Sequence, residues 1–197
     1  MIERDRFTFI REKYGLHASW AVWAEEGDTP KSNMDDVSIF EKEDVHLELN
    51  PEVVLVGLNF GTDISSWNPQ KNLFQNFHWK GGGDFKVRYA VRNTPFWGAY
   101  MTDIIKDFPE LVSTNVMSYL RKNQSVVDEN IVSFKEELQD IGASNPILVG
   151  FGNDAYNILR KNLGTDLKIV KALHYAHYIS KEKYREHIKQ LIEDLDT

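Results

Sequence analysis

Residues 50–63 (NPEVVLVGLNFGTD) join a continuous apolar run to a polar turn that is bracketed by two glycines. The run Val53–Leu58 has the composition of a parallel strand buried on both faces. Gly57 and Gly61 allow the backbone to turn sharply or to approach another group closely. Asn59 lies between them, at the expected carboxyl end of the strand, which is where open α/β sheets bind ligands. The stretch therefore predicts a parallel sheet and raises the question of what Asn59 contacts.

Strand-like and helix-like patterns alternate along the rest of the chain. Three more apolar segments resemble buried strands, and amphipathic or capped segments resemble helices. Such alternation favours a parallel sheet with helices on both faces. The predicted fold class is α/β, a three-layer α/β/α sandwich with a four-stranded parallel sheet. The expected strands are Val53–Leu58, Ala99–Ile105, Pro146–Gly150 and Lys168–Leu173, and the expected helices cover residues 2–14, 35–43, 128–141, 153–163 and 181–195.

The chain of 197 residues is long enough to form one domain with a substantial core. We expect a single domain, residues 1–197, in which a helical and irregular N-terminal segment (1–50) packs on a core formed by residues 51–197. Residues 59–98 are mostly irregular in pattern. A segment of this length is usually functional or contains helices that the pattern does not reveal.

The composition excludes several classes of site. There is no cysteine, so disulfides, thiolate metal sites, iron–sulfur clusters and a cysteine nucleophile are ruled out. No apolar run approaches the length that spans a membrane, and the charged N-terminus does not resemble a signal peptide. We expect a soluble, cytoplasmic protein that is a monomer and does not associate with membranes.

The formal net charge of −7 does not favour nucleic-acid binding, but the charge is uneven. Residues 25–52 contain ten acidic and two basic side chains. Residues 63–100 contain five basic and two acidic side chains, and residues 158–190 contain eight basic and three acidic ones. Two interpretations remain open: a basic face that binds an anionic partner, or ordinary solvated helix charge.

Polar side chains follow three of the expected strands. Asn59 and Asp63 follow the first, Asp103 lies at the end of the second, and His174 and His177 follow the fourth. If the sheet is parallel, these groups gather at one edge, where an amide, carboxylates and imidazoles indicate a hydrolytic site. Each group also has a simpler role: the asparagine could satisfy its own turn, the aspartates could cap helices, and the histidines could be ordinary loop residues.

The third strand ends in residues 150–155 (GFGNDA), which fit the G-x-G-x-x-A pattern of dinucleotide-binding sites. The match is not in the first strand–helix unit, and the next strand ends without an acid for a ribose hydroxyl. Close packing of strand and helix is the favoured role, and an unrelated nucleotide-binding protein is an alternative. There is no P-loop motif, and His174 and His177 lack a carboxylate-rich partner motif. No metal and no cofactor are predicted.

Taken in order, these motifs resemble the uracil-DNA glycosylase superfamily. VVLVGLNFG is similar to the G-x-N-P-G motif of the mismatch-specific and single-strand-selective branches. Residues 73–80 resemble the N-R-F-W-K stretch of the mismatch-specific branch. ILVGFGNDAYNIL is similar to a third-strand segment of the family, and KIVKALHYAHYIS lies where the family has His-Pro-Ser-Pro. The resemblance covers roughly residues 50–190.

The resemblance implies a site. Asn59 matches the residue that positions the attacking water, which it would do by proximity because an amide does not take up protons near neutral pH. His174 matches the histidine that stabilises the departing base, and Asp63 is a possible base if its loop folds back. Asp103 falls near the residue that reads the base edge. The other expected substrate contacts are Gly57, Leu58 and Phe60 in the turn, Phe74 or Phe77 stacking on the base, His177, and Tyr178 entering the duplex.

The implied function is hydrolysis of the N-glycosidic bond of uracil or a related damaged base, with single-stranded or mismatched DNA as the partner. Three departures from the family pattern favour an alternative, a catalytically inactive or repurposed relative that binds nucleic acid or a protein. Phe60 replaces a proline, and residues 174–177 (HYAH) lack both prolines and the serine. Asp103 is a carboxylate that, when ionised, accepts hydrogen bonds but donates none.

Overall fold

The structure is a computed structural model and describes residues 1–60, 73–106, 108 and 110–195. Its sheet has the strand order β1-β3-β2-β4-β5. Strands β2, β3, β4 and β5 are parallel to their neighbours, whereas β1 pairs with β3 in the antiparallel direction. The bounds are β1 Ser19–Trp20, β2 Asn50–Asn59, β3 Ala99–Ile105, β4 Ile147–Phe151 and β5 Ile169–Ala172.

The α/β class is confirmed, but the expectation of a four-stranded, all-parallel sheet is wrong. The four expected strands are present, and a fifth strand makes the sheet mixed. The two residues of β1 are too few to show a strand pattern, and they are held by their neighbour: Ser19 lies opposite Met101, and Trp20 lies opposite Tyr100. Strand β2 also begins earlier than expected, at Asn50, with a shift in its register against β3.

The helices agree with the sequence in the N- and C-terminal parts of the chain and differ in the middle. Helix α4 begins earlier than expected, residues 35–43 form only a 3-10 turn, and α2 and α3 were not anticipated. The bounds are α1 Arg4–Tyr14, η1 Ser38–Glu41, η2 Val45–Leu47, α2 Asp84–Val91, α3 Ser113–Lys122, α4 Gln124–Asp140, α5 Gly152–Leu163 and α6 Lys181–Leu195. None of the helices in the described ranges is both long and apolar enough to cross a membrane.

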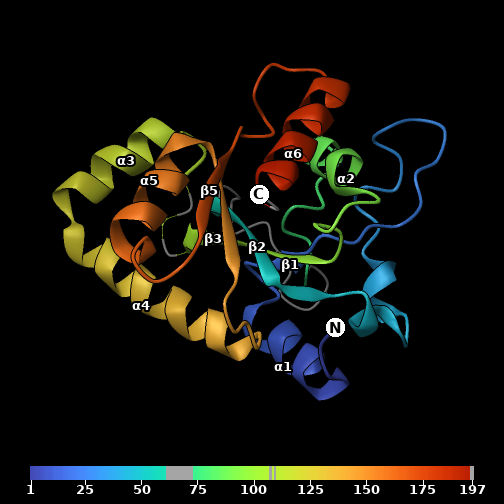
Figure 1. Ribbon diagram of the computed structural model, residues 1–197, viewed down its shortest axis with the longest axis horizontal. Coiled ribbons are helices and arrows are strands. Elements are labelled where there is room, and N and C mark those ends of the chain that lie inside the picture. The colour runs from blue at the N-terminus through green and yellow to red at the C-terminus, as the bar shows by residue number, and fades with distance from the viewer. Residues whose placement is uncertain (61–72, 107, 109, 196–197) are drawn as a thin grey trace.

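Helices lie on both faces of the sheet (Figure 1). Successive side chains of β2 point to opposite faces, because a strand has a period of two. Val54 and Val56 belong to a cluster with residues of α1, α3, α4 and α5, whereas Val53 and Leu55 belong to a cluster with residues of α2 and α6. This alternation explains why β2 needs a continuous apolar run.

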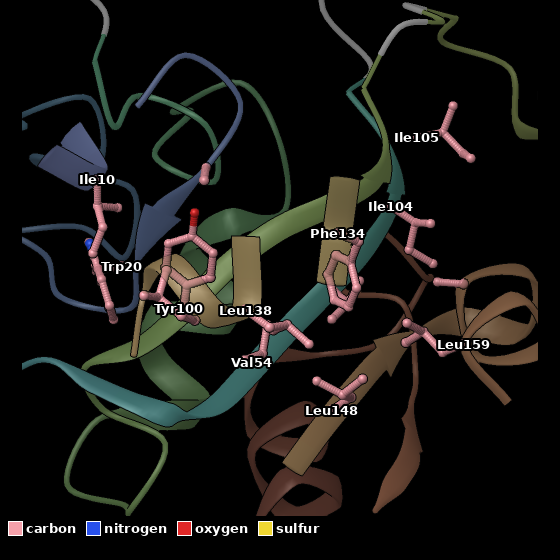
Figure 2. Close-up of a cluster of buried hydrophobic side chains, with 14 of the residues drawn as sticks. Ile10, Trp20, Val54, Tyr100, Ile104, Ile105, Phe134, Leu138, Leu148 and Leu159 are labelled. Atoms are coloured by element: carbon pink, nitrogen blue, oxygen red, sulfur yellow. The ribbon is translucent and has the colours of Figure 1, made fainter. Parts of the chain in front are cut away.

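The N-terminal segment shares the larger of these two clusters with the sheet. Ile10 of α1 and Trp20 of β1 lie with Tyr100 and Val54, as Figure 2 shows. The rings of Trp20 and Tyr100 meet edge to face, with centroids 4.8 Å apart. Residues 1–50 therefore pack directly on the sheet rather than forming a separate core.

A buried ion pair lies beside the end of β3. Glu137 of α4 is fully buried, and its Oε1 accepts hydrogen bonds from the hydroxyls of Tyr100 (2.7 Å) and Thr102 (2.9 Å). The Lys106 ammonium lies 2.7 Å from Glu137 Oε2 and also donates to the backbone carbonyl of Asp103. The pair thus connects α4 to the strand end that carries Asp103.

Candidate functional site

A pocket of about 630 Å³ opens at the carboxyl ends of the four parallel strands. The chain leaves β2 toward β3 on one side and leaves β4 toward β5 on the other, so the pocket lies where the strand order diverges. Open α/β sheets bind ligands at such a point. The lining includes Asn59 at the end of β2, Asp103 in β3, Phe151 at the end of β4 and His174 after β5.

The structure brings together six of the residues that the sequence singled out. They come from segments that are far apart in the chain, and they line this one pocket: Gly57, Leu58, Asn59, Phe77, Asp103 and His174.

The other candidates lie elsewhere. Phe60 and Phe74 are buried in the core and do not line the pocket; the Phe74 ring packs against Phe40, with centroids 4.9 Å apart. Of the two phenylalanines considered for stacking, only Phe77 is therefore in place. His177 and Tyr178 are exposed beyond the pocket's edge. Asp63 lies outside the described residues.

Gly57 and Asp103 are opposite each other on β2 and β3. A Cβ at Gly57 would lie 2.1 Å from Asp103 Oδ1, so the glycine leaves the space that the carboxyl group occupies. Asp103 Oδ2 accepts a hydrogen bond of 2.9 Å from Asn76 Nδ2, and no described residue donates to Oδ1. Gly57 thus makes room for the carboxyl group of Asp103, which lines the pocket.

The Asp103 side chain is only 5% exposed, and burial raises its pKa to about 7. The hydrogen bond from Asn76 and the charge of Lys106 act in the opposite direction, and the carboxylates of Glu137 and Asp84 reinforce the rise. Near neutral pH the group therefore exchanges between an acid and an anion. As the acid it donates a hydrogen bond, and as the anion it only accepts.

Asp84, the first residue of α2, is a second buried carboxyl group in the pocket. Burial raises its pKa to about 6, although the backbone N–H of Trp79 donates to its Oδ2 at 2.8 Å. It was missed because residues 59–98 lacked a readable pattern. The run Gly81–Gly83 before it was a usable signal: a Cβ at Gly83 would lie 2.8 Å from the carbonyl oxygen of Tyr175, another pocket residue.

Asn59 is held by the loop that follows β3. Its Nδ2 donates to the carbonyl oxygens of Phe108 (3.2 Å) and Glu110 (2.8 Å). Because carbonyls only accept hydrogen bonds, these contacts fix which atom is nitrogen and which is oxygen. No described residue donates to Asn59 Oδ1. The Oδ1 atom of Asn59 therefore remains available as a hydrogen-bond acceptor, whereas both N–H groups of the side chain are bonded to the loop.

His174 is fixed in one neutral form. Its Nδ1 accepts a hydrogen bond of 3.1 Å from the backbone N–H of Ala176, so the ring proton is on Nε2. The ring stacks on Tyr175, with centroids 4.6 Å apart, and its other side remains exposed. Desolvation lowers the pKa of His174 and favours the neutral ring. The geometry makes Nε2–H an available donor.

Phe77 adopts a strained backbone conformation, with φ of 64°. For a residue of this size, the left-handed region costs on the order of 1–3 kcal/mol and persists only where neighbours impose it. Here its backbone N–H donates to Asn76 Oδ1 at 3.1 Å, and its ring lies near Phe151 and Tyr175. The strain places an aromatic ring directly beside Gly57 and Asp103.

Large apolar side chains are exposed around the opening. Trp79 (59% exposed) and Leu111 (82% exposed) both line the pocket, and Tyr178 is fully exposed two residues after Ala176, a lining residue. Trp97 instead packs against Trp23, with ring centroids 5.8 Å apart, and Trp67 lies outside the described residues.

The two chain segments with excess basic residues meet where α2 packs on α6 (Figure 1). The Arg185 guanidinium of α6 donates to the carbonyl oxygens of Tyr89 and Arg92 at the end of α2. Lys86 of α2 donates to the carbonyl oxygen of His177, which places its ammonium beside the loop that follows β5. Basic groups therefore lie near the pocket's edge, not within its described lining.

Gly150 supports the packing interpretation of the G-x-G-x-x-A match. A Cβ there would lie 2.9 Å from the backbone nitrogen and Cα of Tyr156 in α5, so the glycine permits close contact of β4 with α5. Within the described part of the chain, no three His, Asp or Glu side chains are grouped so that they could hold a metal ion.

No protein-family model and no curated protein matches this sequence.

Proposed function

We propose that the protein is a uracil-DNA glycosylase-like enzyme that hydrolyses the N-glycosidic bond of uracil or a related damaged base in DNA. The observation that supports this most strongly is the convergence of Asn59, Phe77, Asp103 and His174 on one pocket at the ends of parallel strands. The sequence resemblance assigns each of these four residues a role in such a site. The finer fold, a uracil-DNA glycosylase-like arrangement of the four parallel strands, is part of the same proposal.

The pocket has a volume suited to a single flipped nucleotide. A volume of about 630 Å³ is within the usual range for small-molecule sites. Asp103 and Phe77 are almost fully buried within it, so a base that remained stacked in a duplex would not reach them. The target nucleotide must leave the stack and enter, with one face of its base against Phe77.

His174 would stabilise the departing base. Breaking the glycosidic bond of uracil leaves negative charge on the base oxygens, and a fixed donor directed at that charge is worth a few kcal/mol. The hydrogen bond from the Ala176 N–H to Nδ1 keeps the proton of His174 on Nε2, and His174 lines the pocket, so Nε2–H would serve as the donor. A neutral donor serves here because the ring need not be protonated first.

Asn59 would position the attacking water. Its Oδ1 can accept a hydrogen bond from water, while the carbonyls of Phe108 and Glu110 hold the amide in one orientation. The gain comes from proximity and orientation, because the amide does not remove a proton. The water's proton would pass to a carboxylate or to solvent.

A second candidate function is a non-enzymatic relative that binds nucleic acid or a protein partner. It is favoured by the acidic character of the pocket and by Phe60, which is buried where the family motif has proline. Gel-shift titration across salt separates the possibilities, because binding to DNA weakens steeply with salt as counterions are released. Salt-insensitive binding, or no binding, would disfavour DNA as the partner.

The decisive experiment is base release from single-stranded and mismatched oligonucleotides that carry uracil or other damaged bases. We expect Asn59→Ala and His174→Ala each to lower the rate by about 100-fold, on the scale of a lost transition-state hydrogen bond. His174→Gln should keep part of the activity because it retains an N–H donor. Asn157→Ala, on an exposed face of α5, is the matched control and should be unchanged. Absence of release of every base tested, from folded wild-type protein, would refute the proposal.

A further inference from the structure

The hydrogen-bonding groups of the pocket are mostly acceptors. Four side-chain amides line it. Asn153 is exposed, and its Oδ1 accepts a hydrogen bond from the Lys171 ammonium, whereas the other three donate to the protein itself. Asn59 donates to Phe108 and Glu110, Asn76 donates to the carbonyl of His17 and to Asp103, and Gln75 donates to the carbonyl of His78. Both N–H groups of Asn59 and of Asn76 are therefore used, so these amides offer a ligand no donor.

The pocket is also acidic. Asp84 and Asp103 are each 5% exposed, and Oδ1 of Asp103 receives no hydrogen bond from any described residue. The nearest ammonium, that of Lys106, is directed at Glu137 and at the backbone carbonyl of Asp103. Among the described residues that line the pocket there is no lysine or arginine. Two buried carboxyl groups thus lie in the pocket without a cationic partner there.

Aromatic rings complete this environment. Phe77, Phe151 and Tyr175 form one group of ring contacts, and the exposed Trp79 lies at the pocket's edge. Aromatic faces attract cations, most strongly in sites that are shielded from water. Burial holds the pKa of both carboxyl groups above the usual range. Ionisation of either group is therefore unfavourable unless a positive charge lies nearby.

We infer that the pocket selects a cationic nucleobase with an amino group, such as an N-alkylated adenine or cytosine, in preference to uracil. This inference rests on the proposed glycosylase function and names its substrate class. The N–H groups of such a base match the free oxygens of Asp103 and Asn59, and its charge matches the two carboxylates. Uracil instead places two carbonyl oxygens beside its single ring N–H, so acceptors would face acceptors.

The chemistry of a cationic base suits a site that departs from the family motif. Water oxygen forms a bond to the anomeric carbon, and the bond from that carbon to the base nitrogen breaks. The bonding electron pair moves into the base, which leaves as a neutral molecule, and the water loses a proton to solvent. No oxyanion develops on the base, so the reaction needs less stabilisation from His174.

Binding can be tested without hydrolysis. Isothermal titration at pH 8 would compare the cations 1-methyldeoxyadenosine and 3-methyldeoxycytidine with deoxyadenosine, deoxycytidine and deoxyuridine. We expect each cation to bind at least tenfold more tightly than its neutral parent. Asp103→Asn and Asp84→Asn should each reduce that ratio, whereas Glu129→Gln, at an exposed carboxylate of α4, should not. Equal affinities for cations and parents, or tightest binding of deoxyuridine, would overturn the inference.

Base release from oligonucleotides that carry the same alkylated bases or uracil separates this inference from the proposed function. Faster release of the alkylated base supports both. Selective binding of the cations without release of any base supports the selectivity of the pocket and refutes the glycosylase. Release of uracil alone, without cation selectivity, supports the glycosylase and overturns the inference.

Discussion

Gly57 and Asp103 form a matched pair across β2 and β3: the Asp103 carboxyl group occupies the space that any side chain at Gly57 would need. The opening sequence stretch placed a glycine two residues before Asn59, and this contact gives its reason. Gly57 leaves room for the side chain of Asp103 on the neighbouring strand. Asp103 in turn lines the pocket, so Gly57 affects the pocket through Asp103.

Replacing Gly57 with alanine should therefore act through Asp103. The added Cβ would force the carboxyl group to rotate, because 2.1 Å is far inside contact distance, and the hydrogen bond from Asn76 would be lost. We expect Gly57→Ala to abolish base release and to lower the free energy of unfolding by about 1–3 kcal/mol. Urea unfolding is the measurement. The double variant Gly57→Ala/Asp103→Ala should recover stability but not activity; if it does not, the clash lies elsewhere.

Asp103→Asn should stabilise the protein at alkaline pH. The folded pKa of about 7 lies above the unfolded value, so the folded state binds more protons between about pH 4 and pH 7. The contribution of Asp103 to stability is thus fully present near pH 4 and is lost as the pH rises through 7. The variant removes this loss, worth on the order of 4 kcal/mol at most at pH 8. Thermal unfolding of both proteins from pH 4 to pH 8 would show the difference.

The difference in stability between the wild type and Asp103→Asn is the informative quantity, because the titration of His78 changes the stability of each protein with pH in the opposite direction. Burial lowers the pKa of His78 to about 3, so its contribution is present above its unfolded pKa and is lost as the pH falls toward 3. Both proteins share that effect. A gap between their curves that does not widen from pH 4 to pH 8 would contradict the role of Asp103.

Lys106→Met should strongly destabilise the fold. It leaves the fully buried Glu137 carboxylate without its ammonium partner, and breaking a buried pair in this way costs about 3–5 kcal/mol. Denaturation by urea measures the loss. The double variant Lys106→Met/Glu137→Gln should regain part of it, because the uncompensated charge is gone. Equal stability of the two variants would show that Glu137 is not the cause.

Tyr178→Ala should separate DNA binding from folding. The side chain is fully exposed, so the free energy of unfolding should change by less than about 0.5 kcal/mol. If the ring stacks on a base, its loss should weaken DNA binding by about 1–3 kcal/mol. Fluorescence anisotropy with a labelled oligonucleotide measures this, and Leu47→Ala, also exposed but distant along the chain, is the control. Unchanged binding in Tyr178→Ala would remove this residue from the interface.

The sequence predicted the parts of the fold that carry a long local signal. Continuous apolar runs marked the four parallel strands, and helix α6 has the bounds expected from its pattern. Helix α2 was missed because it has only eight residues and its N-cap residue, Gly83, supplies no side-chain cap. Helix α3 was missed because it buries only Val116 and Leu120, which is too few positions to show a period.

Site residues could be predicted where a motif lay at the end of a strand. They could not be predicted where their role depends on tertiary contacts. Asn59, Asp103 and His174 were found from their positions at or just after the carboxyl ends of strands. Asn76 and Asp84 were not, because their roles depend on partners distant in the chain: Asn76 on Asp103, and Asp84 on a pocket that contains Tyr175. Side-chain orientation was also beyond the sequence, which gave Phe74 and Phe77 equal standing.

Strand β1 has a consequence for how molecules of this protein meet one another. Its two residues cover the outer edge of β3 at Tyr100 and Met101, and the backbone bonds between Ala21 and residues 98 and 99 continue the cover. An open edge would present unpaired backbone groups to a strand of another molecule, which is a common route to aggregation. The N-terminal segment thus covers this edge of β3 and prevents it from pairing with a strand of another molecule.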